Sequence, residues 1–194
     1  MIIDGKKEAE ILRQDIKKEI DSLKSKNNKV PGLTVILVGD FAPSQIYVKN
    51  KERSAKEVGI NSNVVRYSKE VTEEEVLKKI EELNNDSDVS GILVQLPLPP
   101  QINKEKIINA VSPKKDVDGF HPMNVGNLSS GYRCLVPCTP LGCLYLIKKV
   151  EKNLSGKNAV IIGRSNLNGK PMAQLLLKEN CTVTIVHSKT KDLK

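Results

Sequence analysis

Four short groups of residues in this sequence could carry chemistry. The first is Tyr47 and Lys51, which are four residues apart and would share one face of a helix. A lysine that moves protons near neutral pH needs surroundings that favour its uncharged form, and a tyrosine one turn away offers a flat, amphipathic wall. Lys51 is also one of many lysines on a charged helix, and taken alone it is better explained as a solvated surface residue.

The second group surrounds Gln95, in an otherwise apolar run from Gly91 to Leu96 that predicts a buried strand. A buried glutamine needs hydrogen-bond partners, and the prolines that follow fix the chain as it leaves the sheet. Ligands of parallel sheets bind beyond the carboxyl ends of the strands. Gln95 is therefore either a ligand-facing residue or a structural polar group with internal partners.

The third group, Lys115 to Pro122, contains Asp116 and Asp118 followed by Gly119. A calcium loop needs more acidic ligands at regular spacing. Asp118 could hold the amino groups of a ligand through both carboxylate oxygens, and an Asx turn is the equally open alternative.

The fourth group is the segment from Gly163 to Gly169, between an expected strand and an expected helix. Glycines at its two ends would permit a tight turn and a close approach of the backbone to a pyrophosphate at the helix N-terminus. The spacing differs from that of the dinucleotide fingerprint, so a purely structural loop is an equally open interpretation.

The next expected strand ends at His187, Ser188 and Lys189, where an NAD site usually carries an acidic residue. Cations and hydroxyls there, with Arg164 in the facing turn, suit a 2′-phosphate and favour NADP over NAD. For the His187 ring itself we expect no special task.

The elements that must position these groups alternate between helix and strand, which predicts an α/β fold with parallel sheets. Ser44 and Thr139 are predicted helix N-caps, Thr72 with Glu75 forms a capping-box pattern, and residues 112–138 are expected to be a functional loop and linker. Helices are expected over residues 8–24, 44–58, from 73, 139–152 and 171–179, and strands over 33–38, 64–67, 91–96, 158–162 and 182–186. The chain stops one strand–helix–strand unit into a nucleotide domain, so we expect that domain to be incomplete at its C-terminus.

Composition narrows the class of protein. The 194 residues carry a net charge of +8, but most lysines lie beside glutamates and only 3% of residues are aromatic. This pattern favours solvated helix faces over a nucleic-acid-binding stripe. No apolar run approaches the ~20 residues of a membrane span, and no secretory segment is present, so we expect a soluble, cytoplasmic protein.

The four cysteines are predicted to be small buried thiols, because their spacing is poor for zinc and a cytosolic chain of this size does not need disulfides. They are Cys134, Cys138, Cys143 and Cys181. No metal site is expected.

Five motifs, in order, resemble the bifunctional methylenetetrahydrofolate dehydrogenase/methenyltetrahydrofolate cyclohydrolase family. They are Ser44 to Lys51, Gly91 to Pro99, Lys115 to Pro122, Pro137 to Pro140 and Gly163 to Ser165. The resemblance runs from the N-terminus to Thr190. It implies a three-layer α/β catalytic domain over residues 1–137, which binds folate, and a Rossmann-like NADP-binding domain over residues 138–194, which is truncated at the C-terminus. Family members are commonly homodimers.

The resemblance also implies an activity and roles for the residues above. NADP would oxidise 5,10-methylenetetrahydrofolate to the methenyl form, and water would then open that product to 10-formyltetrahydrofolate. By motif position, Lys51 is the catalytic residue near the folate N10 and Gln95 orients it. Tyr47 stacks near the reacting end of the folate, and Asp118 anchors the pterin amino groups.

For the cofactor, the resemblance implies a phosphate-binding set formed by Gly163, Arg164, Ser165 and Ser188. Asn168 departs from the family pattern, which has valine there, and this puts cofactor affinity in more doubt than the folate chemistry. The expected partners are folate substrates, with no nucleic acid and no membrane. Two rival hypotheses are a non-catalytic NADP- or folate-binding remnant and a nucleic-acid binder suggested by the charge.

Overall fold

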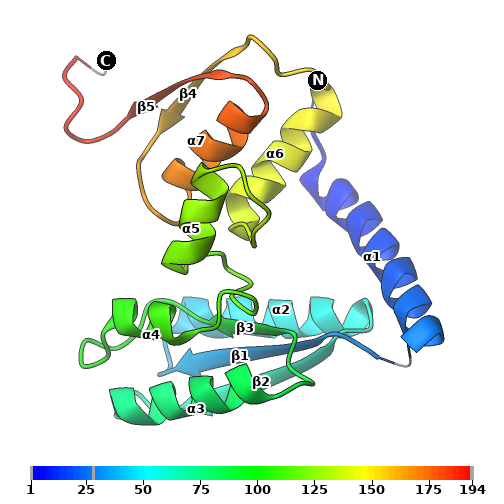
Figure 1. Cartoon of the computed structure of the whole chain (residues 1–194), viewed down its shortest axis with the longest axis vertical. Helices are drawn as coiled ribbons and strands as arrows, with labels where there is room; N and C mark the ends of the chain where they lie inside the picture. The colour runs from blue at the N-terminus through cyan, green and yellow to red at the C-terminus, as the bar shows by residue number, and fades with distance from the viewer. Residues whose placement is uncertain (1, 28, 193–194) are drawn as a thin grey trace. The chain divides into compact units, whose positions relative to one another are not determined.

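The computed structural model describes residues 2–27 and 29–192, and the chain divides into two compact units (Figure 1). The N-terminal unit runs from Lys6 to Val117, and the C-terminal unit starts at Asp118 and includes the first few residues of the chain. Helices and strands alternate up to residue 94 and again from residue 158, with three consecutive helices between these stretches, which confirms the predicted α/β class. The domain boundary expected at residue 137 stays a prediction.

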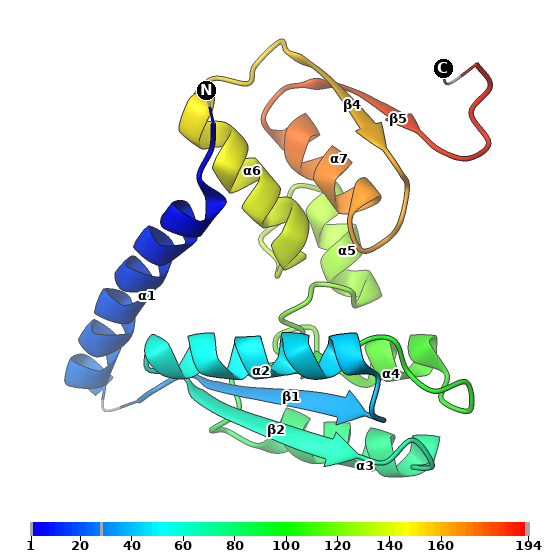
Figure 2. The same ribbon diagram turned by 180° about the vertical axis from the view of Figure 1, so that it is seen from behind.

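The N-terminal unit contains a three-stranded parallel sheet in the order β2-β1-β3. Its strands β1 and β2 lie side by side in Figure 2. Its elements are α1 (Gly5–Asn27), β1 (Gly32–Val38), α2 (Ala42–Glu57), β2 (Asn61–Tyr67), α3 (Glu73–Asn85), β3 (Gly91–Val94) and α4 (Lys104–Ala110). The short helix α4 was missing from the sequence prediction, because a single buried side chain over seven residues gives no helical period.

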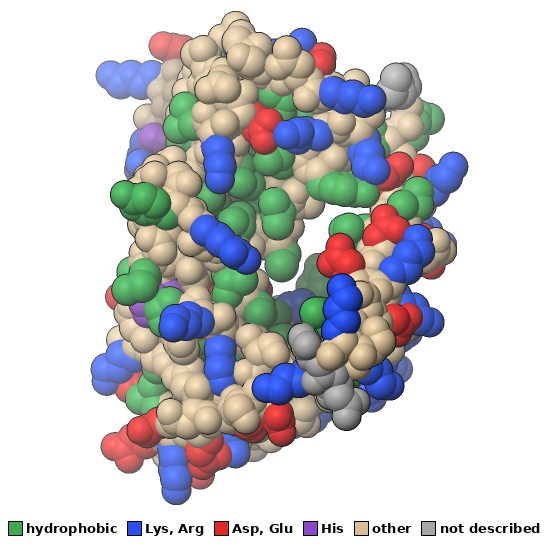
Figure 3. Space-filling model, turned by 45° about the vertical axis from the view of Figure 1, so that its right-hand side comes forward, with side chains coloured by type: hydrophobic (Ala, Val, Ile, Leu, Met, Phe, Trp, Pro, Cys, Tyr) green, Lys and Arg blue, Asp and Glu red, His purple; other side chains and the backbone are tan. Residues whose placement is uncertain are grey.

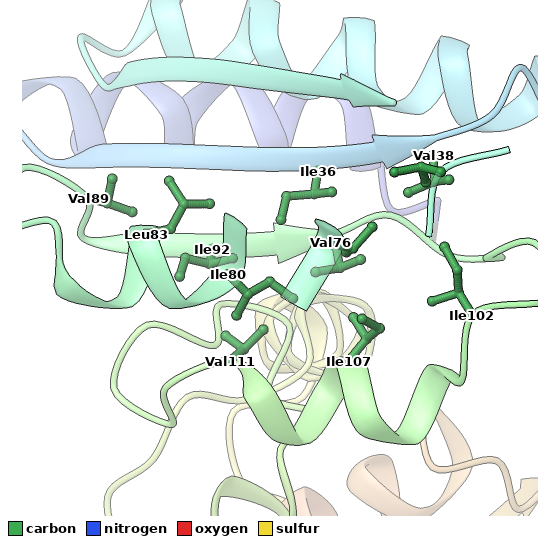
Figure 4. Packing of buried hydrophobic residues seen from close by; sticks show 12 residues of the cluster. Ile36, Val38, Val76, Ile80, Leu83, Val89, Ile92, Ile102, Ile107 and Val111 are labelled. Atoms are coloured by element: carbon green, nitrogen blue, oxygen red, sulfur yellow. The ribbon is translucent and has the colours of Figure 1, made fainter. Parts of the chain in front are cut away.

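Helices cover both faces of this sheet and make three layers, as predicted. Ile36 of β1 packs with Ile80 of α3 and Ile107 of α4 on one face (Figure 4). Val35, the preceding residue, packs with Val48 of α2 on the other face. Because successive side chains of a strand point to opposite faces, the unbroken apolar run of β1 serves both layers at once.

The segment after α4 is tied to the sheet and to the end of α3. The Lys115 ammonium donates to the backbone carbonyls of Leu83 at 2.8 Å and Asp86 at 2.6 Å, where the last turn of α3 leaves acceptors unpaired. The Ile92 N–H donates to the Lys115 carbonyl at 2.7 Å, and Ile92 pairs in parallel with Asp116. These bonds carry the backbone along β3 toward Asp118.

The predicted capping box of α3 is confirmed, but two other predicted helix starts are wrong. Thr72 and Glu75 make both bonds of the box. Helix α2 begins at Ala42, so Ser44 is not its N-cap but lies inside the first turn, with 3% of its surface exposed. Thr139 likewise lies inside α6, which begins at Cys138. Proline is tolerated throughout the first turn of a helix, so Pro43 and Pro140 do not identify the exact residue at which α2 and α6 begin.

The C-terminal unit contains the two parallel strands β4 and β5 joined by α7, and α7 also packs with α5 and α6. The elements are α5 (Pro122–Ser129), α6 (Cys138–Val150), β4 (Asn158–Ile162), α7 (Gly169–Lys178) and β5 (Thr182–Val186). Residues 112–138 are therefore not all loop. The His121 ring accepts the Met123 N–H and starts α5. Ala159 and Ile161 of β4 pack against the apolar core of the C-terminal unit, which includes Leu175 and Leu176 of α7. On the opposite face of the strand, Val160 and Ile162 are 67% and 81% exposed.

The positive charge is distributed over the surface. Lys56 pairs with Glu52 at 2.7 Å and Lys106 with Glu73 at 2.8 Å, so basic side chains of several helices meet acidic ones. On the face shown in Figure 3, Lys and Arg side chains lie scattered among acidic and uncharged ones. No helix in the described residues has the length and apolar character that crossing a bilayer requires.

Candidate active site

The N-terminal unit brings together two of the predicted site residues, which are 44 positions apart in the sequence. The Lys51 ammonium donates to Gln95 Oε1 at 3.1 Å. Lys51 lies in the middle of α2, and Gln95 follows β3, so the pair forms where the strand leaves the sheet. Both side chains are half-buried.

Gln95 is held from two sides. Its Nε2 donates to the Leu96 carbonyl at 2.8 Å, which turns the amide oxygen toward Lys51. Its backbone N–H donates to the Ile36 carbonyl at 2.9 Å and extends the ladder with β1. The prediction that Gln95 lies inside the strand is wrong by one residue, since β3 ends at Val94. A side chain just past the strand end is at the sheet edge where ligands of such folds bind.

The chemistry of the pair follows from the acceptor. An amide oxygen carries no net charge, so it accepts a hydrogen bond from the amine without the ion pair that a carboxylate in its place would form. Within residues 2–27 and 29–192 the Lys51 ammonium has this one partner, so further donors remain for a ligand.

Tyr47 lies one turn before Lys51 on α2, and 62% of its surface is exposed. In the described part of the chain, no hydrogen bond involves its side chain. The ring is therefore available for stacking beside the amine of Lys51.

Asp118 is the first residue of the C-terminal unit, directly after the segment that pairs with β3. The next residue, Gly119, has a φ of 67°, and a Cβ there would lie 2.7 Å from the Leu135 carbonyl oxygen. No larger residue fits at position 119, so the path of the chain just after Asp118 depends on this glycine. Its predicted role stays a prediction.

The turn between β4 and α7 closes on itself. Gly163 has a φ of 120°, and its N–H donates to the Val186 carbonyl at 2.7 Å. A Cβ on Gly169 would lie 2.2 Å from the Gly163 carbonyl oxygen, so both ends of the turn must be glycine. The glycine at position 169 is therefore needed because it lies directly against the backbone of Gly163.

Inside this turn, Ser165 accepts two hydrogen bonds, whereas Arg164 has no carboxylate partner in the described part of the chain. Ser165 Oγ accepts the Asn168 N–H and its carbonyl accepts the Lys170 N–H, both at 3.1 Å. The exposed Arg164 guanidinium has no carboxylate partner among residues 2–27 and 29–192. Asn168 is the N-cap of α7 but makes no side-chain capping bond. The turn therefore presents a free cation beside the start of a helix.

A second turn follows β5 and presents Ser188 and Lys189, both exposed. Its ends, His187 and Thr190, are joined by hydrogen bonds. Strand register pairs Ile162 with Val186, so the two turns leave neighbouring strands at the same level.

The prediction that all four cysteines are buried is only partly confirmed. Cys181 is buried and Cys134 half-buried, and burial raises the pKa of the Cys134 thiol, but Cys138 and Cys143 are exposed. None of the four forms a disulfide. The described residues contain no group of three His, Cys, Asp or Glu side chains placed to hold a metal ion.

The structure also contains a pocket that the sequence did not predict, within the C-terminal unit. It has a volume of about 210 Å³ and lies between α5 and α7. Its apolar wall is formed by side chains such as Val125, Leu128, Ala173 and Ile185, with Asn166 of the β4–α7 turn and Lys170 of α7 also lining it. Because the lining residues come from two helices, a strand and the connecting loops, their spacing in the sequence does not predict the pocket.

Two family models match the chain in the order of the two units. The catalytic-domain model of tetrahydrofolate dehydrogenase/cyclohydrolase matches residues 3–118, and the NAD(P)-binding-domain model of the same family matches residues 137–194. The chain belongs to the tetrahydrofolate dehydrogenase/cyclohydrolase family. The resemblance found from five motifs is confirmed, and the predicted nucleotide site falls in the family's NAD(P)-binding domain.

Relatives in this family align along the whole chain. The bifunctional protein FolD of Pelagibacter ubique is 69% identical over 194 residues, and that of Wolbachia pipientis from Culex pipiens is 57% identical. The chain covers 69% and 66% of these two proteins, so it spans about two thirds of their length.

Solved structures of the family have the same fold. The bifunctional FolD enzyme of Campylobacter jejuni is 47% identical with a TM-score of 0.96, over 99% of this chain and 68% of that one. The Trypanosoma brucei enzyme, solved with NADP and an inhibitor, is 34% identical with a TM-score of 0.93, over 98% of this chain and 65% of that one.

Proposed function

We propose that this chain provides the folate and NADP sites of a bifunctional enzyme of one-carbon metabolism. The enzyme oxidises 5,10-methylenetetrahydrofolate to 5,10-methenyltetrahydrofolate and then hydrolyses it to 10-formyltetrahydrofolate. The observation that carries the proposal is the bond of 3.1 Å between Lys51 and Gln95 in the family's catalytic domain. A homodimer in the cytoplasm is part of the same proposal.

Lys51 is the proton-transfer residue of the proposed hydrolysis. Water adds to the bridging carbon of the methenyl cation, and the uncharged amine of Lys51 takes a proton from that water. The hydroxyl of this adduct then loses its proton and becomes the formyl carbonyl as the bond from the carbon to N5 breaks. N5 keeps the electron pair and takes up a proton, so one proton is released overall. The neutral oxygen of Gln95 holds the amine in place through a hydrogen bond and places no negative charge beside it.

Tyr47 and Asp118 bind the substrate in this proposal. The exposed ring of Tyr47 stacks on the flat folate one helical turn from Lys51. The Asp118 carboxylate accepts hydrogen bonds from the pterin amino groups, and charge-assisted bonds of this kind fix orientation as well as affinity.

The turn from Gly163 to Gly169 fits a dinucleotide phosphate. It combines a closed glycine turn, a helix N-terminus and the free guanidinium of Arg164. Ser165 shapes the turn, and Arg164 with Ser188 would hold the 2′-phosphate of NADP. When bound there, the nicotinamide supplies the hydride acceptor for the oxidation.

The proposal is tested by two assays on the purified chain. We expect NADPH absorbance to rise with methylenetetrahydrofolate and NADP, and more slowly with NAD. We expect the absorbance of methenyltetrahydrofolate to fall faster than in buffer. A chain that catalyses neither reaction and binds no folate would contradict the proposed function.

A further inference from the structure

We infer that His187 and Thr190 set the preference for NADP over NAD, because they hold the turn that presents Ser188 to the 2′-phosphate. Neither residue touches the phosphate in this account, so both are positioning residues. The inference rests on the proposed cofactor site and adds the residues that maintain its selectivity.

Three hydrogen bonds close the turn from His187 to Thr190. The Lys189 N–H donates to His187 Nδ1 at 3.2 Å, and the His187 N–H donates to Thr190 Oγ1 at 2.9 Å. The Thr190 N–H donates to the His187 carbonyl at 2.8 Å. Two of the three bonds use a side chain, so they depend on these residue types.

The His187 ring acts here as a backbone mimic. Its Nδ1 accepts a backbone N–H two residues ahead, as an Asx side chain does in a turn. His121 makes the same kind of bond to the Met123 N–H at 3.0 Å, where it starts α5. The histidine for which the sequence predicted no task therefore shapes the chain after β5.

The turn leaves the two side chains proposed to meet the phosphate, Ser188 and Lys189, exposed to solvent. Ser188 and Lys189 are exposed, and within the described residues neither the Ser188 hydroxyl nor the Lys189 ammonium has a partner. Across the strand pair, the Gly163 N–H donates to the Val186 carbonyl, so Arg164 lies one residue and Ser188 two residues beyond a pair of bonded backbone positions. A dianionic phosphate gains from these cations and donors, whereas the 2′-hydroxyl of NAD gains little.

The test compares two disruptive variants with two conservative ones in the full chain. His187→Ala and Thr190→Val each remove one acceptor of the turn. Thr190→Ser keeps the hydroxyl acceptor, and His187→Asn replaces the ring nitrogen with an amide oxygen that can accept the same N–H. Dissociation constants for NADP and for NAD are measured by isothermal titration calorimetry, and the melting temperature of each variant is recorded.

We expect the disruptive variants to raise the dissociation constant for NADP by about 3- to 10-fold, the equivalent of one lost hydrogen bond, and to leave that for NAD within about twofold. The conservative variants should retain most of the NADP affinity. This pattern at an unchanged melting temperature supports the inference.

Three results overturn it. The affinities for both cofactors could fall together, the disruptive variants could keep the wild-type ratio, or the conservative variants could lose selectivity as fully as the disruptive ones. If the wild-type chain itself does not prefer NADP, the proposed cofactor fails as well, and this outcome is visible before any variant is made.

Discussion

At the scale of single residues, the pair Lys51 and Gln95 is the centre of the chemistry proposed for the N-terminal unit. Lys51 is one of several lysines on α2, and its neighbour Lys49 is exposed on the same helix. What distinguishes Lys51 is an amide acceptor from the residue that follows β3, fixed in turn by the Leu96 carbonyl. Residue type alone could not separate the two lysines.

Replacing this amine should stop the hydrolysis without removing the substrate site. We expect Lys51→Met to lower cyclohydrolase turnover by about 10²- to 10⁴-fold, because general acid–base groups contribute that much to a rate. Folate should still bind, since Tyr47 and Asp118 are untouched. Turnover is measured from the absorbance of methenyltetrahydrofolate, and folate affinity from fluorescence quenching.

Lys49→Met is the matched control. It removes the same charge from the same helix at an exposed position, so turnover should stay within about twofold of the wild type. Equal turnover in the Lys51 and Lys49 variants would remove Lys51 from the mechanism.

At the scale of elements, the β4–α7 connection shows why both glycines of the turn are needed. The two ends of the turn touch, because Gly169 begins α7 directly against the carbonyl of Gly163. The sequence spacing predicted a tight turn, and the contact between the glycines explains why their spacing need not follow the usual dinucleotide fingerprint.

A methyl group at this contact should destabilise the chain. We expect Gly169→Ala to lower the free energy of unfolding by about 1–3 kcal/mol, because its Cβ would lie 2.2 Å from a backbone oxygen and force the turn to move. NADP affinity should fall as well. Urea unfolding followed by circular dichroism measures the first effect.

Gly142→Ala provides the comparison within α6. Nothing lies within 4 Å of a Cβ built there, and alanine is the better helix former, so we expect a gain of about 0.5–1 kcal/mol. Equal stability changes at both positions would show that the glycine contact in the turn does not matter.

At the scale of the whole molecule, stability is distributed unevenly between two cores. In the N-terminal unit, β1 pairs with β2 and β3 and is buried from Thr34 to Val38. In the described part of the C-terminal unit, β4 pairs only with β5, and its residues alternate between half-buried and exposed.

Hydrogen exchange should follow this difference. We expect the backbone amides of β1 to exchange more slowly than those of β4, because a central strand covered on both faces opens only with the whole unit. Mass spectrometry of peptides from the exchanged chain measures both. Protection of β4 equal to that of β1 would show that the two cores open together.

The sequence by itself determined the local features of this protein. Periodic apolar residues predicted most helices and strands, the Thr72 and Glu75 pattern predicted the start of α3, and five motifs identified the family. These signals depend on residues a few positions apart, which local backbone geometry brings together in any fold.

Only the tertiary structure decided which distant residues meet. It joined Lys51 to Gln95 across 44 positions, buried Ser44 inside α2, and set Gly169 against Gly163. It also gave the His187 ring a structural bond to the Lys189 backbone. Such contacts depend on how strands pair and helices pack on them, and no short spacing in a sequence records that.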